Sequence, residues 1–483
     1  MVNIAAPGRA TNGPGPHEHN TRSGRPAVAV LAACGILMAL QQTMILPLLP
    51  SLPALLNTSA GTASWLVTAT LVSGAVVTPL IGRLADMYGK KRLILLTLAV
   101  VVGASLLGAV SESLPPLILA RTLQGCGLSL IPVAMATMRD VLPPDRVPGG
   151  VATMSASLAI GAATGLPLSG VIVTFLDWHW IFWVMVISAP VLAVAVLRVV
   201  PSSRPHPSDA FDRLGALVLA GALTALLLPL SKGGQWGWTS RETLALVATG
   251  LVLLAIWVPL QLHVHAPLVN LRMAARPPVL LVNACALLVG FALFSNILIT
   301  TLMLQLPIVT GFGAGMSVLE AGLWLMPIGL VNIVVAPLAG RAITRFGAPR
   351  VLLVATIQLT AAFAVRIPFS HEPWQILGGA MLVSIGLALT LAAVPTLIMS
   401  MVPISESASA TTITALLQSV GTSTASATMA ATATVWTIYL GAQTYPALIA
   451  FTAMFSFSAG AACCAALFVF PLAVRHKRPG PPR

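Results

Sequence analysis

The chain has 483 residues, of which 57% are hydrophobic and only 8% are charged, and its formal net charge is +13 at pH 7. Soluble domains carry about 25% charged residues, so a chain this poor in charge could not cover a water-exposed surface. The basic residues form short clusters between apolar runs, without a long basic face bearing aromatic residues, which argues against nucleic-acid binding. The composition indicates an integral membrane protein surrounded by lipid.

Apolar runs of membrane-spanning length recur along the chain, because about 20 helical residues cross the ~30 Å hydrocarbon layer. Residues 1–26 precede them, are rich in Gly, Pro, Asn and His, and lack a signal-peptide pattern, so we expect a disordered cytoplasmic tail. The run at 409–435 is rich in Ser, Thr and Ala, a composition that suits close helix packing in lipid. The fourteen predicted spans are 27–49, 62–81, 93–110, 114–136, 150–174, 179–199, 214–231, 243–262, 279–306, 317–340, 351–369, 375–399, 409–435 and 446–472.

The distribution of Lys and Arg predicts the orientation in the membrane. With the N-terminus inside, all but four of the 25 Lys and Arg residues fall on the inner side, as the positive-inside rule requires. The exceptions are three residues assigned to outer loops, Lys232, Arg241 and Arg366, and one charge within a span, Arg121. We therefore expect a multi-pass protein of the cell (plasma or inner) membrane with both termini cytoplasmic.

An internal repeat predicts two related halves. Residues 77–96 and 335–354 are identical at eight of 20 positions, and their glycines Gly82 and Gly340 are 258 residues apart. Duplication of a six-helix unit produces such a repeat, and the offset covers eight spans, so two helices are inserted between the halves. The predicted parts are a tail (1–26), an N-terminal six-helix bundle (27–200), a two-helix insert with flanking loops (201–275), a C-terminal six-helix bundle (276–474) and a basic cytoplasmic tail (475–483).

The first copy of the repeat carries a charged cluster. Its two glycines allow a tight inner turn and a close approach of backbones. One acid among several basic residues can form ion pairs at the inner face that latch one conformation and release it in another. The alternative is an ordinary positive-inside loop. The predicted latch consists of Gly82, Arg83, Asp86, Gly89, Lys90 and Arg92.

Arg121 lies eight residues inside the apparent start of its span, where an arginine costs about 2.5–3.5 kcal/mol on insertion scales. An arginine persists at this depth when it faces a wet cavity or a polar partner, and the alternative is a side chain that reaches back to the interface. We expect Arg121 to face the cavity and to bind Gln41 or Gln42.

These segments resemble the major facilitator superfamily, and within it the fourteen-helix drug:proton antiporters, or multidrug exporters. The charged cluster is similar to the family's signature loop, whose acid meets the inner start of the helix that begins here near Ser407. Trp65-Leu-Val-Thr and the aromatic stretch 178–182 resemble the starts of the exporters' helices 2 and 6. The family's intramembrane arginine motif is matched by Arg121, Gln124 and Gly125, and its helix-5 antiporter motif by Gly161, Gly165, Pro167 and Gly170.

The helix-5 match has a second interpretation. The family usually has proline directly after the second glycine, whereas Leu166 follows Gly165 here and the proline is Pro167. Glycines spaced by four also pack helices in any membrane protein. An antiporter motif and a helix-packing stripe therefore both remain open.

The resemblance implies an all-α major-facilitator fold with two six-helix bundles and two inserted helices. It also implies secondary-active, proton-coupled export of lipophilic small molecules by alternating access, as in drug or antibiotic efflux. We expect a monomer without a cofactor. An importer or facilitator on the same fold is the alternative, followed by a non-transporting sensor or membrane enzyme. The sequence has no catalytic motif and no metal-ligand spacing, so we expect no enzyme and no metal site.

One departure from the family concerns charge. The family carries an aspartate at the position of Gln41, thought to handle the proton and to attract cationic drugs, and glutamine cannot titrate. Glu320 is an edge acid that reads as part of a capping box with Ser317, with proton carriage as the alternative. A cavity without a carboxylate should prefer neutral or anionic amphiphiles. The predicted cavity residues are the amides Gln41, Gln42, Asn296, Asn332 and Gln358.

Overall fold

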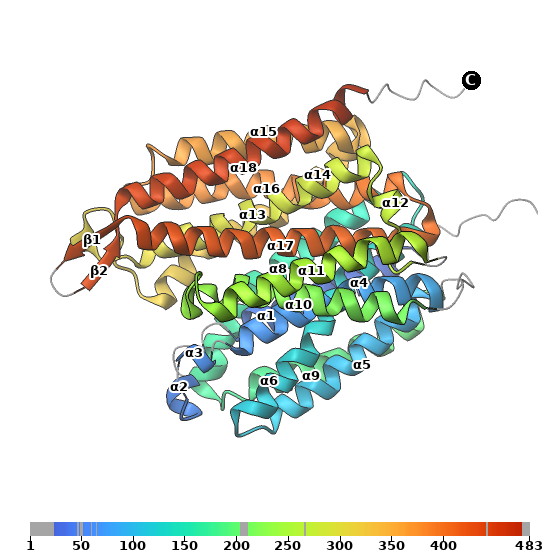
Figure 1. Ribbon diagram of the computed structural model, residues 1–483, viewed down its shortest axis with the longest axis horizontal. Coiled ribbons are helices and arrows are strands. Elements are labelled where there is room, and N and C mark those ends of the chain that lie inside the picture. The colour runs from blue at the N-terminus through green and yellow to red at the C-terminus, as the bar shows by residue number, and fades with distance from the viewer. Residues whose placement is uncertain are drawn as a thin grey trace, which may run out of the picture.

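The computed structural model describes residues 24–475, except 46–47, 49–51, 59, 64, 203–210, 265–266 and 441–442. The described chain is almost wholly helical, and its long helices run along one common direction (Figure 1). The first half and the insert contain α1 (Gly24–Thr43), α2 (Leu52–Leu55), α3 (Ala60–Ala63), α4 (Trp65–Tyr88), α5 (Lys90–Ala109), α6 (Leu114–Gln124), α7 (Leu130–Val141), α8 (Val147–Phe175), α9 (Trp180–Val199), α10 (Arg213–Trp236), α11 (Arg241–His263) and α12 (Leu271–Ala274). The second half contains α13 (Pro277–Gln305), α14 (Val318–Phe346), α15 (Ala348–Arg366), α16 (Pro373–Met401), α17 (Ser407–Val435), the strands β1 (Thr437–Leu440) and β2 (Gln443–Pro446), and α18 (Leu448–Arg475).

Thirteen helical segments of the described chain are long and apolar enough to cross a membrane, and α6 and α7 form one of them through a 3₁₀ turn at Gly125–Ser129. The 29-residue helix α17 falls outside this set because Ser, Thr and Ala replace the larger apolar residues. Its hydroxyls donate to carbonyls of their own helix, as at Thr424, Thr428 and Thr432, each four residues back. A helix with such internally satisfied side chains can lie among other helices in lipid.

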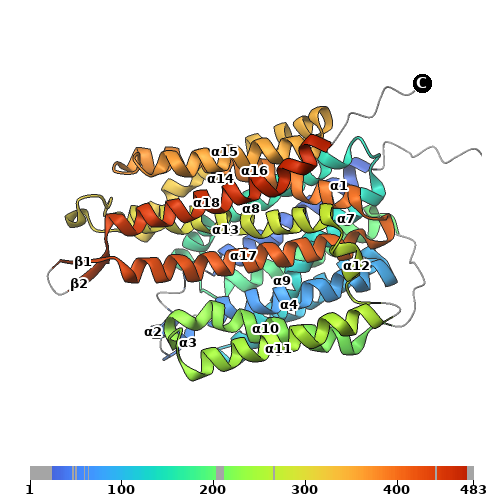
Figure 2. The same ribbon diagram turned by 45° about the horizontal axis from the view of Figure 1, so that its top comes forward.

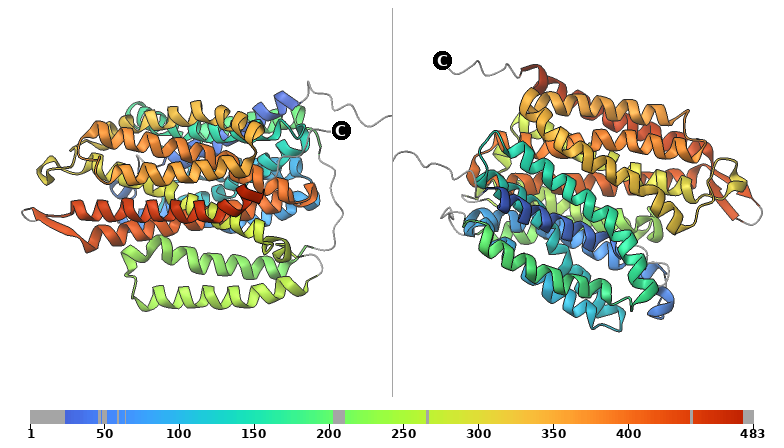
Figure 3. Two further views of the ribbon diagram at one scale, coloured as in Figure 1. Left: turned by 90° about the horizontal axis from the view of Figure 1, so that it is seen from above. Right: turned by 180° about the vertical axis from the view of Figure 1, so that it is seen from behind.

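The buried apolar side chains form three clusters. One cluster holds together the helices of the first half, α1 and α4 through α9. A second holds together α13 through α18, and a third lies where α10 and α11 meet α4 and α17. Figure 3 shows the insert helices, in green, set against one flank of the other helices. The bounds predicted for these parts stay a prediction, and residues 1–23 and 476–483 of the predicted tails lie outside the described residues.

The two halves meet chiefly along two helix pairs, α4 with α17 and α8 with α14. Gly82 of α4 lies against Thr412 of α17, since an added Cβ would come 2.3 Å from the Thr412 hydroxyl. Gly340 of α14 lies against α8, where an added Cβ would come 3.2 Å from the Cβ of Ala152. The two repeat glycines therefore occupy corresponding positions, each at a contact with the other half.

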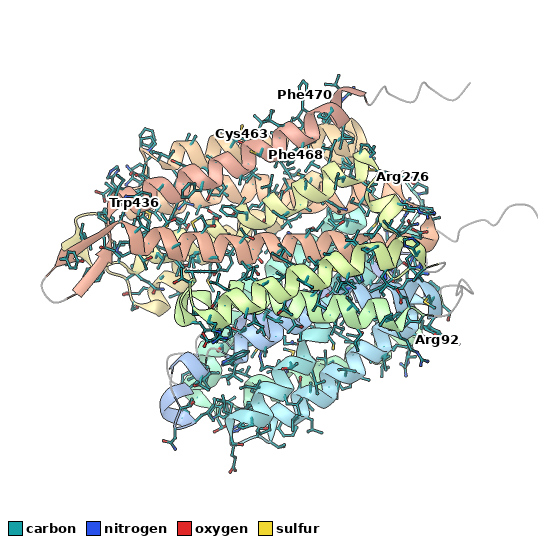
Figure 4. All side chains as sticks on the ribbon, in the orientation of Figure 1. Arg92, Arg276, Trp436, Cys463, Phe468 and Phe470 are labelled. Carbon is teal, nitrogen blue, oxygen red and sulfur yellow. The ribbon has the colours of Figure 1, made fainter. Side chains whose placement is uncertain are left out.

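The two ends of the helix bundle differ in chemistry. Arg92 and Arg276 lie at the end where α18 finishes, and Trp436 lies at the opposite end beside the antiparallel pair β1–β2 (Figure 4). We call these the basic end and the hairpin end. Basic residues at one end of the helices follow the positive-inside pattern of membrane proteins.

Three local expectations were wrong. Gly82 lies inside α4, so its role is close packing, and only Gly89, with φ 100°, lies at the turn into α5. Lys232 and Arg366 do not lie in loops: the first belongs to α10 and the second is the last residue of α15, and both are fully buried. Helix α10 continues past its predicted apolar run, whereas α15 ends within its run, and in both cases an aromatic ring accommodates the cation, Trp65 for Lys232 and Phe455 for Arg366.

Candidate substrate cavity and charged latch

A cavity lies between the two halves, with an empty volume of about 600 Å³ including the open space at its mouth. Its walls come from α7 and α8 of the first half and from α13, α16 and α17 of the second. The described lining residues include no Asp, Glu, Lys, Arg or His. The polar ones are four hydroxyl residues and one amide: Ser155, Thr390, Thr411, Thr414 and Gln418.

The five amides predicted to line the cavity do not lie in this lining. Three of them bond between helices: Gln41 donates to the Gln124 carbonyl at 3.2 Å, Asn296 to the Ala380 carbonyl at 3.3 Å, and Gln358 to the Leu382 carbonyl at 2.8 Å. Asn332 donates to Ile328 of its own helix, and Gln42 is half-buried on α1. An amide in lipid must find a partner, and helix contacts supply one as readily as a cavity does.

Arg121 is buried and bonded to neutral acceptors. Its Nε donates to the Leu66 carbonyl at 3.0 Å, and its Nη1 donates to Gln124 Oε1 at 2.9 Å and to the Gln41 carbonyl at 3.5 Å. Gln124 in turn donates to Ser105. The predicted contact with Gln41 is present through its backbone, but Arg121 does not line the described cavity.

Close packing surrounds this arginine. An added Cβ at Gly125 would lie 2.6 Å from the Thr70 carbonyl of α4, so only glycine fits there. The helices α1, α4 and α6 are thereby held together around Arg121. Among the described residues, Arg121 has no carboxylate partner.

Arg366 is a second buried arginine, which the sequence analysis had assigned to an outer loop. Its Nη1 donates to Asn296 Oδ1 at 2.7 Å, its Nη2 donates to Thr300 Oγ1 at 3.0 Å, and its guanidinium lies 4.6 Å from the centre of the Phe455 ring. The signal in the sequence was the polar pair Asn296 and Thr300, four residues apart on one face of a mostly apolar helix.

At the basic end, Asp86 lies at the start of α17, as predicted. Its carboxylate accepts bonds from the amide nitrogens of Ala408 at 3.3 Å and Ser409 at 2.8 Å, and from the Ser409 hydroxyl at 2.8 Å. Free N–H groups and the positive end of the helix dipole favour an anion at this position. The contact joins α4 of the first half to α17 of the second.

Lys90 extends this contact. Its Nζ lies 2.8 Å from Asp140 on α7 and donates to the Ser407 hydroxyl at 2.9 Å. Arg139 donates to the Val402 carbonyl at 3.0 Å, another link between the halves. The sequence interpretation missed Asp140 and Arg139 because they follow a different span.

The remaining predicted latch residues contribute less. Arg83 is half-buried and Arg92 is exposed, and neither forms an ion pair or side-chain hydrogen bond with the described residues. The interlocking part of the latch is therefore Gly82, Asp86 and Lys90 with their partners on α7 and α17, and Gly89 forms the turn between α4 and α5.

Glu320 forms the capping box that its spacing predicts. Ser317 N donates to the Glu320 carboxylate at 2.8 Å, and Glu320 N donates to the Ser317 hydroxyl at 3.2 Å. The side chain is exposed at the start of α14, and the alternative role as a proton carrier stays a hypothesis.

The glycines of α8 divide into two groups. Added Cβ atoms at Gly161 and Gly165 would strike α1, at the Ile36 carbonyl and the Thr43 hydroxyl, whereas one at Gly170 would meet nothing within 4 Å. Pro167 lies inside the helix. Helix packing thus accounts for the first two glycines, and an antiporter role for the segment stays a prediction.

Comparisons with known proteins agree with this arrangement. Residues 31–426 match the family model described as Major Facilitator Superfamily. The fold is similar to that of the human organic anion transporter MFSD10 (TM-score 0.67, 17% identity, 92% of this chain and 99% of that one). It is also similar to the proton:xylose symporter XylE (TM-score 0.66, 14% identity, 94% of this chain and 96% of that one).

Relatives of known sequence carry names of resistance, export and transport proteins. The chain is 30% identical to a putative multidrug resistance protein MdtD of Pectobacterium atrosepticum (69% of this chain, 72% of that one) and 29% identical to a tetracenomycin C resistance and export protein of Streptomyces glaucescens (70% and 62%). An uncharacterized MFS-type transporter of Mycobacterium tuberculosis is 31% identical over 68% of this chain, and the match spans about half of that longer protein (47%). The chain is a multi-pass membrane protein with the major-facilitator fold, and it belongs to the Major Facilitator Superfamily.

Proposed function

We propose that the protein is a secondary-active exporter of lipophilic small molecules that works by alternating access. The observation that carries this proposal is the uncharged cavity between two halves whose basic ends are joined by Asp86 and Lys90. Alternating access needs a cavity that opens to one side of the membrane at a time and polar contacts that can break and close the other side. The cavity and the Asp86 and Lys90 contacts meet these two needs. The name of the tetracenomycin C resistance and export protein, together with that of the putative multidrug resistance protein, supports export over import.

The basic end belongs in the cytoplasm under this proposal, because positive residues are retained there. The Asp86 contact then closes the cytoplasmic side, so the substrate leaves at the hairpin end. Proton coupling is the proposed driving force, with a monomer as the working unit. The described cavity lining offers no carboxylate, so the proton would bind outside it.

Export of a neutral dye from a pump-deficient bacterial host tests the proposal. Everted vesicles with an imposed pH gradient, acid inside, should accumulate Nile red when they contain the protein. Arg121→Ala should abolish this accumulation at unchanged expression, because it leaves the acceptors of α1, α4 and α6 without their shared donor. Accumulation independent of the pH gradient would favour a facilitator, and movement in the opposite sense would favour an importer.

A further inference from the structure

The hydroxyl groups of the cavity are already committed as donors. Thr390 donates to the Leu387 carbonyl at 2.9 Å, Thr411 to the Ser407 carbonyl at 2.8 Å, and Thr414 to Asn283 Oδ1 at 2.9 Å. A hydroxyl has one proton to donate, so each of these groups can offer a substrate only lone pairs.

The Ser155 hydroxyl also donates its proton within the protein. One of its two acceptor carbonyls is free because of a proline. Pro395 has no N–H, which frees the Leu391 carbonyl four residues before it in α16. Ser155 Oγ lies 3.4 Å from this carbonyl and 3.2 Å from the Val151 carbonyl of its own helix. The serine hydroxyl is therefore used across the contact between the two halves.

Gln418 is different from the hydroxyl residues. Its side chain lines the cavity from α17, one turn beyond Thr414, and makes no hydrogen bond with any residue that the structure describes. Its amide carries two donor hydrogens and an acceptor oxygen. Among the described lining side chains it is thus the one with N–H groups to offer.

The backbone at this position is held tightly. An added Cβ at Gly290 of α13 would lie 2.1 Å from the Gln418 carbonyl oxygen, so α13 and α17 touch here without an intervening side chain. The backbone that carries the Gln418 side chain is therefore held in place. A fixed backbone favours a hydrogen bond from the amide to one particular oxygen of a substrate.

We infer that Gln418 determines substrate specificity by donating a hydrogen bond to a carbonyl or ether oxygen of an uncharged lipophilic molecule. This inference rests on the proposed function, since it names the substrate class of the same cavity. The rest of the lining supplies apolar contact, and its hydroxyls accept from donors on the substrate. A permanent cation finds no counter-charge in the described lining, and its dehydration is uncompensated.

The test uses the full chain in proteoliposomes with two probes, the uncharged carbonyl dye Nile red and the permanent cation tetraphenylphosphonium. Gln418→Leu should raise the half-saturating concentration of Nile red roughly three- to tenfold while the maximal rate is kept, as expected for one lost hydrogen bond. The matched control is Asn332→Leu, an amide outside the lining that bonds its own helix, and its half-saturation should equal the wild type's.

Gln418→Glu is the complementary variant. It places one carboxylate in the cavity and should create tetraphenylphosphonium transport that the wild type lacks, a gain that misfolding cannot produce. Unchanged half-saturation for Nile red in Gln418→Leu, or tetraphenylphosphonium transport by the wild type, would overturn the inference. Absence of any Nile red transport by the wild type would instead refute the proposed function.

Discussion

Two arginines inside the helix bundle are stabilised without carboxylates. Arg121 uses carbonyls and the Gln124 amide, whereas Arg366 uses Asn296, Thr300 and the face of Phe455. Each half therefore holds a buried arginine whose hydrogen-bonding groups are largely satisfied by neutral partners. The potential inside the protein is expected to be positive, which fits a pathway that carries uncharged or anionic molecules.

Removal of Arg366 should destabilise the second half. Arg366→Ala leaves Asn296 and Thr300 buried without their donor, and each such group costs about 1–3 kcal/mol. Arg366→Lys should recover part of the loss, because an ammonium keeps the charge but not the planar fork that reaches both acceptors. The melting temperature of the detergent-purified protein measures the effect.

The control for this prediction is Arg241→Ala, an exposed arginine at the start of α11, which should change stability by no more than about 0.5 kcal/mol. A melting temperature for Arg366→Ala equal to that of the control would contradict the assigned role of Arg366.

At the scale of helices, the sequence predicts contacts that follow from repeats and from helix ends. The place of Asp86 at the start of α17 was predictable because a helix N-terminus attracts an anion and because the family motif marks the acid. The cavity lining was not predictable. The hydrophobic pattern of a span is nearly uniform around the helix, so nothing in the sequence says whether Gln41 or Gln418 faces the cavity.

Helix α17 illustrates the same limit. Its content of Ser and Thr predicts close packing, and it does pack against α4 and α13, but the partners come only from the three-dimensional arrangement. Arg366 was missed for a related reason, since a cation at the edge of an apolar run reads as a loop residue.

The repeat supplies a matched experiment on the latch. Thr344 stands 258 residues after Asp86, is exposed, and donates only to Gly340 of its own helix among the described residues. Asp86→Asn should weaken closure at the basic end, because an amide replaces a charge-assisted acceptor that contributes about 1.5–3 kcal/mol. Thr344→Val should leave closure unchanged.

Labelling measures this closure. A single cysteine at Thr414, in the cavity, should react faster with an impermeant maleimide added to the basic end in Asp86→Asn than in the Thr344→Val control. Equal labelling rates in the two variants would mean that Asp86 does not hold the gate.

At the scale of the whole molecule, the insert makes the two contacts between the halves unlike each other. Helix α10 packs against both α4 and α17, so it covers that pair, as its place beside them in Figure 2 shows. The pair α8–α14 is also contacted by a third helix, α16, but α16 lines the cavity, and on α14 the side chains of Leu330 and Val334 are exposed. Under the proposed function, we therefore expect a lipophilic substrate to enter from the bilayer on the α8–α14 side.

A reversible crosslink across the α8–α14 contact tests whether the halves must separate. Ala152→Cys with Gly340→Cys places two Cβ atoms about 3.2 Å apart near the basic end, close to the spacing of a disulfide. In a background without the five native cysteines, oxidation should trap the basic end closed and stop transport, and a reductant should restore it. The control pair, Leu226→Cys with Gly250→Cys, joins α10 to α11 inside the insert and should leave transport intact when oxidised. Undiminished transport by the oxidised Ala152–Gly340 pair would show that the substrate moves without separation of the halves at this contact.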